Sequence, residues 1–248
     1  AEGVAQETFT VPRAVPGGVA SVRVHDTDLL LDDTRWFHLP RVGASKVMVV
    51  DGDPGPTPFK SEVFFLERAL SPWGAQRSGV LPQIVSPAGL RELDAAEHRV
   101  VFLANVADPG PYAGQLVEFV RQGGGLVIAM GGNVTPRRYN TQLQELLPTG
   151  LRERVSLVAF EASEGVRLEL PDPDHPLFAP FTNSGRGSFG RIQGFQAMTV
   201  EPYEERGGTS GLDEDPRPAT LLSWSDGNPA LIERRVGQGR VLLWTSTL

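Results

Sequence analysis

Cysteine is absent from all 248 residues of the chain. This absence excludes disulfide bonds, metal sites built from thiolates and any cysteine nucleophile. Positive charge is also in short supply, because 23 lysines and arginines stand against 30 aspartates and glutamates, for a formal net charge of −7. Nucleic-acid binding needs a clustered basic patch, so we expect no nucleic-acid partner. Protein partners and small molecules are left as the classes to consider.

Long apolar runs are missing too. No stretch approaches the roughly 20 residues that a membrane-spanning helix needs. Polar residues follow Ala1-Glu2-Gly3, where a signal peptide would be apolar. The chain starts without methionine and ends directly after a predicted strand, at residues 245–248. We therefore expect it to be a soluble segment of a longer protein.

Two common catalytic motifs are also missing. The Gly-x-Ser-x-Gly motif of serine hydrolases is not found at a strand-to-helix turn. The glycine-rich residues 185–190 lack the Gly-Lys-Ser/Thr ending of a phosphate-binding loop, and no buried strand leads into them. We expect these residues to form a surface loop, and the sequence predicts no catalytic residue.

Residues 1–41 are rich in β-forming side chains. Three short runs at residues 8–11, 20–24 and 35–39 predict strands, separated by turn signals. So few strands do not form a stable sandwich alone. We interpret residues 1–41 as the end of a β-sandwich domain. Its exposed edge predicts docking on the following domain or a dimer through this β segment.

Residues 42–248 alternate apolar strands with helices. Four apolar runs predict buried strands, at residues 46–50, 84–85, 100–104 and 126–130. Apolar residues at helical spacing and turn signals predict helices at residues 61–70, 87–93 and 112–121, the last closed by Gly123. This alternation predicts right-handed βαβ units around a parallel sheet. We expect an α/β fold, a three-layer flavodoxin-like sandwich.

The rest of this domain is less regular. Residues 219–244 contain three β-rich runs separated by glycine turns, which predict a meander of hairpins that completes the sheet. The pattern is weak between residues 151 and 218, and residues 207–218 are expected to form a loop.

Polar residues and glycines follow three of the predicted strands. The carboxyl ends of parallel strands meet at one edge of a sheet, where α/β folds bind ligands. We therefore predict that six residues share a ligand-binding rim: Asp51, Asp53, Asn105, Gly131, Gly132 and Asn133.

Each part of this rim has two interpretations. Asp51 and Asp53 hold a cation or a substrate amine, or they cap the helix and bind turn backbone. One carboxylate pair lacks the six or more oxygen ligands that calcium prefers, so no metal site is predicted. The N–H groups of Gly131 and Gly132 receive an anion or a carbonyl oxygen, or the glycines serve the turn alone.

A few other residues invite a functional interpretation. His175 is expected to be a structural corner ahead of Leu177. A pocket that joined His175 to Asp51 or Asp53 would favour an enzyme, and their separation would favour binding. Ser61 is predicted to be a helix N-cap.

Two arginine pairs and three aromatic residues have both a structural and a binding interpretation. The pairs Arg137-Arg138 and Arg234-Arg235 are predicted to be solvated, with the binding of a phosphate or an acidic partner as the alternative. Phe64, Phe65 and Trp73 are predicted to pack in the core and at its rim, whereas an exposed aromatic edge would indicate a protein interface.

Several stretches, taken in order, resemble a known family. The resemblance is carried by residues 49–55, 61–64, 103–106 and 120–126 and extended by residues 174–177, 226–231 and 237–241, so that it spans about residues 46–245. They are similar to the C-terminal soluble part of bacterial BatA-type membrane proteins, which are aerotolerance-regulator-like and often carry a von Willebrand A domain. The resemblance implies a class I glutamine amidotransferase-like domain without established activity. It follows a β-sandwich segment, which residues 22–30 resemble.

The resemblance also shapes the expected function. In amidotransferase-like folds the turn after the strand at residues 126–130 presents the nucleophilic cysteine, and here that turn is Met130-Gly131-Gly132-Asn133. We expect a non-catalytic interaction or ligand-sensing domain of a membrane-anchored bacterial protein, with no cofactor. Its partners would be other domains of the parent chain, a protein, or a small ligand at the rim. The alternative is a cysteine-independent hydrolase or lyase that uses carboxylates, with or without a metal.

Overall fold

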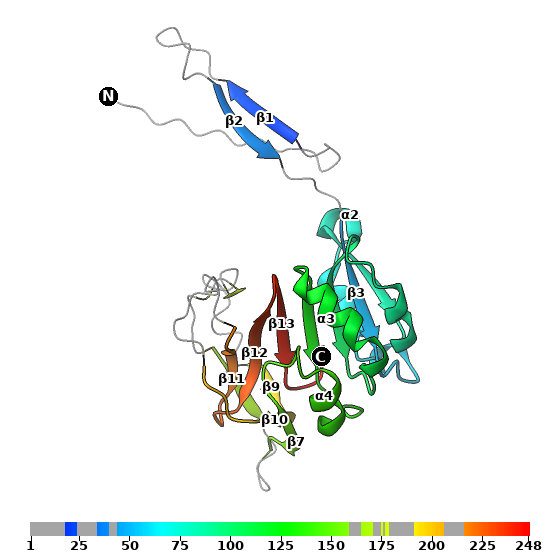
Figure 1. Cartoon of the computed structure of the whole chain (residues 1–248), viewed down its shortest axis with the longest axis vertical. Coiled ribbons are helices and arrows are strands. Elements are labelled where there is room, and N and C mark those ends of the chain that lie inside the picture. Colours follow the sequence, from blue (N-terminus) through cyan, green and yellow to red (C-terminus); the bar gives the residue numbers. More distant parts are fainter. Residues whose placement is uncertain are drawn as a thin grey trace, which may run out of the picture.

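A computed structural model describes residues 18–23, 34–39, 44–158, 165–170, 175, 177–178, 191–205 and 216–248. Strands β1 (Gly18–Arg23) and β2 (Thr34–Leu39) form an antiparallel two-stranded sheet of their own, which Figure 1 draws apart from the main sheet. The two corresponding sequence predictions are confirmed as strands. The predicted strand at residues 8–11 and most of the loop predicted at residues 207–218 lie outside the described residues.

A nine-stranded mixed sheet forms the centre of the molecule, in the order β4-β3-β5-β6-β13-β12-β11-β8-β9 (Figure 1). Its first five strands are parallel: β4 (Val80–Val85), β3 (Ser45–Asp51), β5 (His98–Ala104), β6 (Gly125–Ala129) and β13 (Gly239–Trp244). The other four are antiparallel: β12 (Pro229–Val236), β11 (Ala219–Trp224), β8 (Val166–Glu169) and β9 (Gln193–Gly194). The expected α/β fold is confirmed at this level.

The apolar run of β3 fits a strand that is covered on both faces, whereas β6 and β13 alternate buried and half-buried residues. In β3, every residue from Val47 to Asp51 is buried. The predicted meander is present as β11, β12 and β13, and it joins the parallel strands because β13 lies beside β6 in parallel register.

Helices are short and fewer than the strands in the described part of the chain. The α-helices are α1 (Phe64–Leu70), α2 (Ala75–Ser78), α3 (Ala113–Arg121) and α4 (Pro136–Gln142), and the 3-10 helices are η1 (Pro58–Lys60), η2 (Pro87–Glu92) and η3 (Gly110–Tyr112). Among these described helices, none is long and apolar enough to cross a membrane.

Two helix predictions need correction. The helix predicted from residue 61 begins at Phe64, with Val63 in the N-cap position. The hydroxyl of Ser61 accepts the backbone N–H of Val63 at 3.3 Å, so it caps the turn that leads into the helix and not the helix itself. The 3-10 helix η1 lies just before this turn, with Pro58 as its first residue. The stretch at residues 87–93 is a 3-10 helix.

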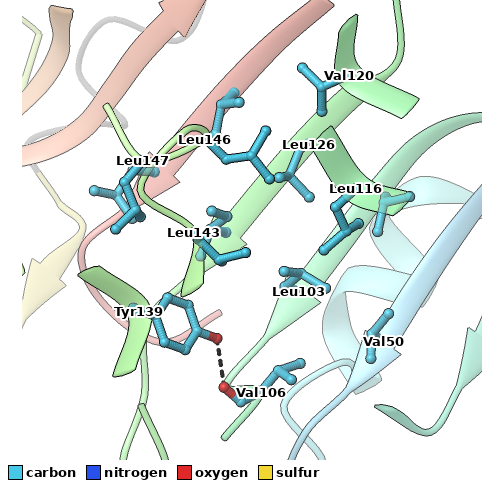
Figure 2. Packing of buried hydrophobic residues seen from close by; sticks show 14 of the residues in the cluster. Val50, Leu103, Val106, Leu116, Val120, Leu126, Tyr139, Leu143, Leu146 and Leu147 are labelled. Atoms are coloured by element: carbon cyan, nitrogen blue, oxygen red, sulfur yellow. Dashed lines mark hydrogen bonds between the residues drawn. The ribbon is translucent and has the colours of Figure 1, made fainter. Parts of the chain in front are cut away.

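One face of the sheet carries the largest core cluster. Leu116 and Val120 of α3 pack on Leu103 of β5 and Leu126 of β6, and Leu143 and Leu146 lie after α4 (Figure 2). Tyr139 of α4 is fully buried in this cluster, and its hydroxyl donates a hydrogen bond of 2.5 Å to the carbonyl of Val106. This bond fixes α4 to the loop after β5.

The region of weak sequence pattern contains strands. β7 (Leu151–Ser156) pairs with β10 (Gln196–Val200) in a second two-stranded sheet, and β8 and β9 join the main one. In β7 the side chains from Arg152 to Arg154 are all exposed, so the apolar alternation that predicts a strand is absent.

The opposite face of the sheet is covered differently. Val63, Leu66 and Leu70, in and just before α1, pack on Val47 and Val49 of β3 and on neighbouring strands. This contact covers one side of that face and leaves a hollow beside it.

Candidate functional site

The predicted rim lies where the strand order of the sheet reverses. The chain passes from β3 to β4, which lies on one side of β3, and then to β5, which lies on the other side of β3. In doubly wound sheets, ligands bind outside the carboxyl ends of the strands at this point. Asp51 ends β3, and Asn105 follows β5 directly.

Asn105 occupies the centre of the rim. Its side chain is 1% exposed, and its backbone has a φ of 51°, in the left-handed region that asparagine tolerates better than most residues. Its Nδ2 donates to Oδ2 of Asp53 at 3.4 Å and to Oε1 of Glu62 at 3.2 Å. Its Oδ1 accepts the backbone N–H of Asn133 at 2.8 Å. One amide therefore ties three loops together.

The remaining rim contacts close the network. Asn133 donates through Nδ2 to the carbonyl of Gly52 at 3.2 Å, so the loop after β6 is fixed to the loop after β3. The Asp51 carboxylate accepts the backbone N–H of Asp53 at 3.0 Å and the hydroxyl of Ser61 at 2.8 Å. Asp51 thus binds turn backbone, while α1 has no side-chain cap.

The glycine positions differ in how much they are constrained. A Cβ at Gly131 would lie 2.3 Å from Cγ of Asn105, so the approach of the two loops requires glycine there. A Cβ at Gly132 would meet only Nη1 of Arg154, at 3.2 Å. Beside both glycines is a hollow of about 20 Å³, bordered by Arg154 and Thr247. That volume holds about one water molecule.

Glu62 belongs to this site, although we had not predicted it. Burial raises the pKa of its carboxyl above the ordinary 4.5, and the nearby carboxylates of Asp53 and Asp51 raise it further. The hydrogen bond from Asn105 and the backbone of Leu248 act in the opposite direction. No local sequence pattern marks Glu62, because its place beside the rim depends on α1 beginning only at Phe64.

Three carboxylates at one edge raise the question of a metal. In the part of the chain that the structure describes, no group of three histidines, aspartates or glutamates is arranged to hold one. The rim side chains that hydrogen-bond do so with one another and with loop backbone, an arrangement that fixes the loops.

A second concave feature lies on the sheet face that α1 covers in part. We call it the groove: a hollow of about 740 Å³ bordered by Val47, Val100, Phe102, Val127, Leu242 and Gly125 from the strands, with His175 and Leu177 beside them. Glu233 and Arg240 also line it, and they form an ion pair of 2.6 Å. Asp51 and Asp53 do not line it.

His175 is on the wall of the groove and 6% exposed. Its Nδ1 accepts the backbone N–H of Leu177 at 3.2 Å, and its ring lies 5.9 Å from that of Phe178. This contact fits the structural corner that the sequence predicts. The groove wall that holds His175 includes the first residues of β3, β4 and β6 (Ser45, Val80 and Gly125), whereas Asp51 is the last residue of β3. The structure therefore does not bring His175 together with Asp51 or Asp53.

The packing prediction for Phe65 and Trp73 is wrong. They are 66% and 72% exposed, and α1 turns Leu66 and Leu70 toward the sheet.

The two arginine pairs differ. Arg137 and Arg138 are exposed, as predicted, and Arg138 donates to the carbonyl of Ala107 at 3.2 Å. Arg234 and Arg235 are half-buried, so the prediction is wrong for this pair, and Arg234 donates to the carbonyl of Leu147 at 2.8 Å.

Comparison with known proteins bears on the fold alone. No family model and no curated protein matches the chain. Two similar solved structures are the cytoplasmic proteins STM3548 and STM1381 of Salmonella typhimurium, at 14% and 13% identity and TM-scores of 0.54 and 0.52. The matches cover 82% and 93% of this chain and 87% and 85% of those chains.

A third similar structure is the cold-adapted β-galactosidase of Rahnella sp. R3, at 15% identity and a TM-score of 0.53. The match covers 83% of this chain but 29% of the galactosidase. All three identities are so low that the likeness supports a shared fold and carries no activity to this chain.

Proposed function

We propose that this chain is a flavodoxin-like, amidotransferase-like domain that binds a ligand or a protein partner and does not catalyse a reaction. The order of its parallel strands supports the fold assignment. Numbered along the chain, β4-β3-β5-β6-β13 is the order 2-1-3-4-5 of flavodoxin-like sheets. The resemblance of residues 46–245 to BatA-type proteins supports the amidotransferase-like kinship.

The separation of His175 from Asp51 and Asp53 carries the functional proposal. A general base needs its reaction partner within hydrogen-bond reach, and His175 lies on the groove while the carboxylates lie at the rim. At the turn where amidotransferase-like folds place the nucleophile, Met130 is buried and 2% exposed. Neither place brings a nucleophile next to His175, and the hydroxyl of Ser61, which donates to Asp51 at the rim, also accepts the backbone N–H of Val63 and so serves the loop.

The rim and the exposed aromatics supply binding surfaces instead. Exposed backbone at Gly132 and Asn133 lies above a network that fixes its geometry. Phe59, Phe65 and Trp73 are large exposed apolar side chains in and around α1, of a kind that marks protein interfaces when they gather. In the proposed setting, the partner is another domain of a membrane-anchored bacterial protein.

A titration of the ¹⁵N-labelled chain tests this proposal. Amino acids, nucleotides and monosaccharides are added one compound at a time, and backbone amide shifts are followed. We expect at least one compound to shift the amides of Asn105, Gly132 and Asn133 with no change in the compound itself. A compound that is converted while those amides shift would overturn the proposal.

The cysteine-independent hydrolase remains a second candidate because of Glu62. A carboxyl whose pKa is raised by burial is suited to donate a proton, and Asn105 holds it near Asp53. In this function Glu62 would be the acid and Asp53 the base. Substitution of either residue separates this candidate from the binding domain, because it would abolish turnover only if the two carboxyls are catalytic.

A further inference from the structure

The groove is deepened at one point on its floor, where Gly125 has no side chain. Gly125 of β6 lies between Val100 of β5 and Arg240 of β13 in the parallel register. A Cβ there would already lie 3.3 Å from Cγ2 of Val100. Glycine at this position leaves open the space between Val100 and Arg240.

The walls of the groove are mostly apolar. Val47, Val100, Phe102, Val127 and Leu242 come from four adjacent strands, and Leu177 lies opposite the strand face. A volume of about 740 Å³ lies within the range of about 300–1,000 Å³ that small-molecule sites occupy. An apolar body of that size would remove these side chains from water.

Two of the three charged residues that line the groove, Glu233 and Arg240, are paired with each other, and the third, Arg99, is exposed to solvent. Glu233 is 3% exposed, and its carboxylate accepts a hydrogen bond of 2.6 Å from Nη1 of Arg240. A buried charge of either sign is costly unless it is paired. Because the ion pair already balances its own charges, an ionised ligand would enter an apolar hollow without a counter-charge from this pair.

His175 supplies a buried polar atom at the groove. The Leu177 backbone already uses Nδ1, and Nε2 is buried with no hydrogen-bond partner among the described residues. A buried polar atom without a partner lowers stability, and a ligand that carries one hydroxyl or carbonyl group would restore the missing hydrogen bond.

We propose that the groove binds an uncharged, elongated apolar molecule that carries one hydroxyl or carbonyl group, with its apolar body along Val100, Phe102 and Val127 and its polar group at Nε2 of His175. This site lies apart from the rim and adds to the proposed function without depending on it. Decan-1-ol represents the ligand class, and decanoate has the same chain with a negative charge.

Displacement of Nile red, an uncharged dye that fluoresces in apolar surroundings, measures binding to the full chain at pH 8. We expect decan-1-ol to displace the dye, and decanoate to need about tenfold more for the same displacement, because its charge must be desolvated. Equal or stronger displacement by decanoate overturns the assignment to an uncharged ligand. No saturable displacement by either compound overturns the site.

A steric variant locates the binding. Val127→Trp places a large ring on the groove floor. We expect it to weaken decan-1-ol binding about tenfold or more, because a ligand that can no longer bury two of its methylene groups loses about that factor in affinity. The matched control is Leu81→Trp, at an exposed residue of β4 that does not line the groove. If the control weakens binding as much as Val127→Trp, the groove is not the site.

Two substitutions of His175 test the polar contact while the turn stays intact. His175→Asn keeps an acceptor near the position of Nδ1 and removes Nε2, whereas His175→Gln keeps a polar group near the position of Nε2. We expect the Asn variant to bind decan-1-ol about fivefold more weakly and the Gln variant to bind nearly as well as the parent chain. Thermal unfolding of both variants reports their folding. Equal affinities in folded Asn and parent chains overturn the role of Nε2.

Discussion

Gly131 approaches Asn105 closely at the rim, so that a Cβ on Gly131 would lie 2.3 Å from Cγ of Asn105. Gly131 is not at a positive φ, so the need for glycine comes from space alone. Asn105 is held by hydrogen bonds to Asp53, Glu62 and Asn133 and has little freedom to move away. The packing of the loops after β5 and β6 therefore depends on glycine at residue 131.

Gly131→Ala should lower the free energy of unfolding by about 1–3 kcal/mol, because the added methyl group overlaps the Asn105 side chain. Gly132→Ala is the matched control. Its methyl group meets only the end of Arg154, so a change within about 0.5 kcal/mol is expected. Urea unfolding measures both variants, and equal losses would contradict the role of the Asn105 contact.

Glu62 makes stability depend on pH in a defined direction. Its pKa is higher in the folded chain than the ordinary 4.5, so its protonated form is favoured by folding. This contribution is complete below pH 4.5 and is lost as the pH rises through the raised pKa. The ionised carboxylate therefore weakens the fold at neutral pH.

Glu62→Gln removes the ionised form and keeps a carbonyl oxygen for Asn105. We expect the variant to be at least as stable as the parent chain at pH 7, with an advantage that shrinks as the pH falls toward 4.5. Urea unfolding at a series of pH values measures the difference. If the stability of the variant minus that of the parent were lower at pH 7 than at pH 5, the predicted sign would be wrong.

The rim could be predicted from the sequence because it depends on strand ends. Asp51 and Asn105 each follow an apolar run, and parallel strands place their ends at one edge. Glu62 and His175 could not be placed in this way. Their positions depend on where a loop crosses the sheet, which no local period encodes.

At the scale of elements, α3 shows how a helix end is set by one residue. Gly123 has a φ of 107°, and the N–H groups of Gly123 and Gly124 donate to the carbonyls of Val120 and Phe119. This is the closure that the sequence predicts for residues 112–121, because glycine is favoured just after a helix.

Gly123→Ala should lower the free energy of unfolding by about 1–3 kcal/mol, because the position needs a positive φ that alanine adopts poorly. The same helix offers a control of opposite sign. A Cβ at Gly114 meets nothing within 4 Å, so Gly114→Ala should raise stability by up to about 1 kcal/mol through helix propensity. Two variants that change stability in the same direction would contradict this account of α3.

Other elements were beyond the reach of the sequence pattern. β7 exposes three charged residues in a row, and its partner β10 is about 40 residues away along the chain. Its pairing is a long-range tertiary effect that a short sequence window does not contain. The apolar parallel strands, by contrast, were predictable, because their side chains pack in the core on one face and against α1 or along the apolar groove on the other.

At the scale of the whole molecule, the chain has one large mixed sheet and a separate hairpin of β1 and β2. Trp36 of β2 is 71% exposed. A two-stranded ribbon is marginally stable on its own, and exposed strand edges tend to pair with other chains. The boundary at residue 41 and the dimer through this segment stay predictions.

Removal of residues 1–40 should convert a dimer of the full chain to a monomer. Size-exclusion chromatography with light scattering measures the mass of both forms. The shortened chain keeps the nine strands of the main sheet, the first of which begins at Ser45, so circular dichroism provides a check of its folding. A full chain that is monomeric at all concentrations would rule out the dimer.

The central claim is that this domain binds and does not catalyse. Its most direct test is turnover of ester, amide, phosphate and glycoside substrates by the full chain with Mg²⁺, Mn²⁺ or Zn²⁺ added. The parent chain is compared with Asp53→Asn and Glu62→Gln, which remove the two carboxylates that Asn105 joins. The account predicts the same background rate in all three proteins. Turnover by the parent chain that either substitution abolishes would contradict it and establish the carboxylate hydrolase.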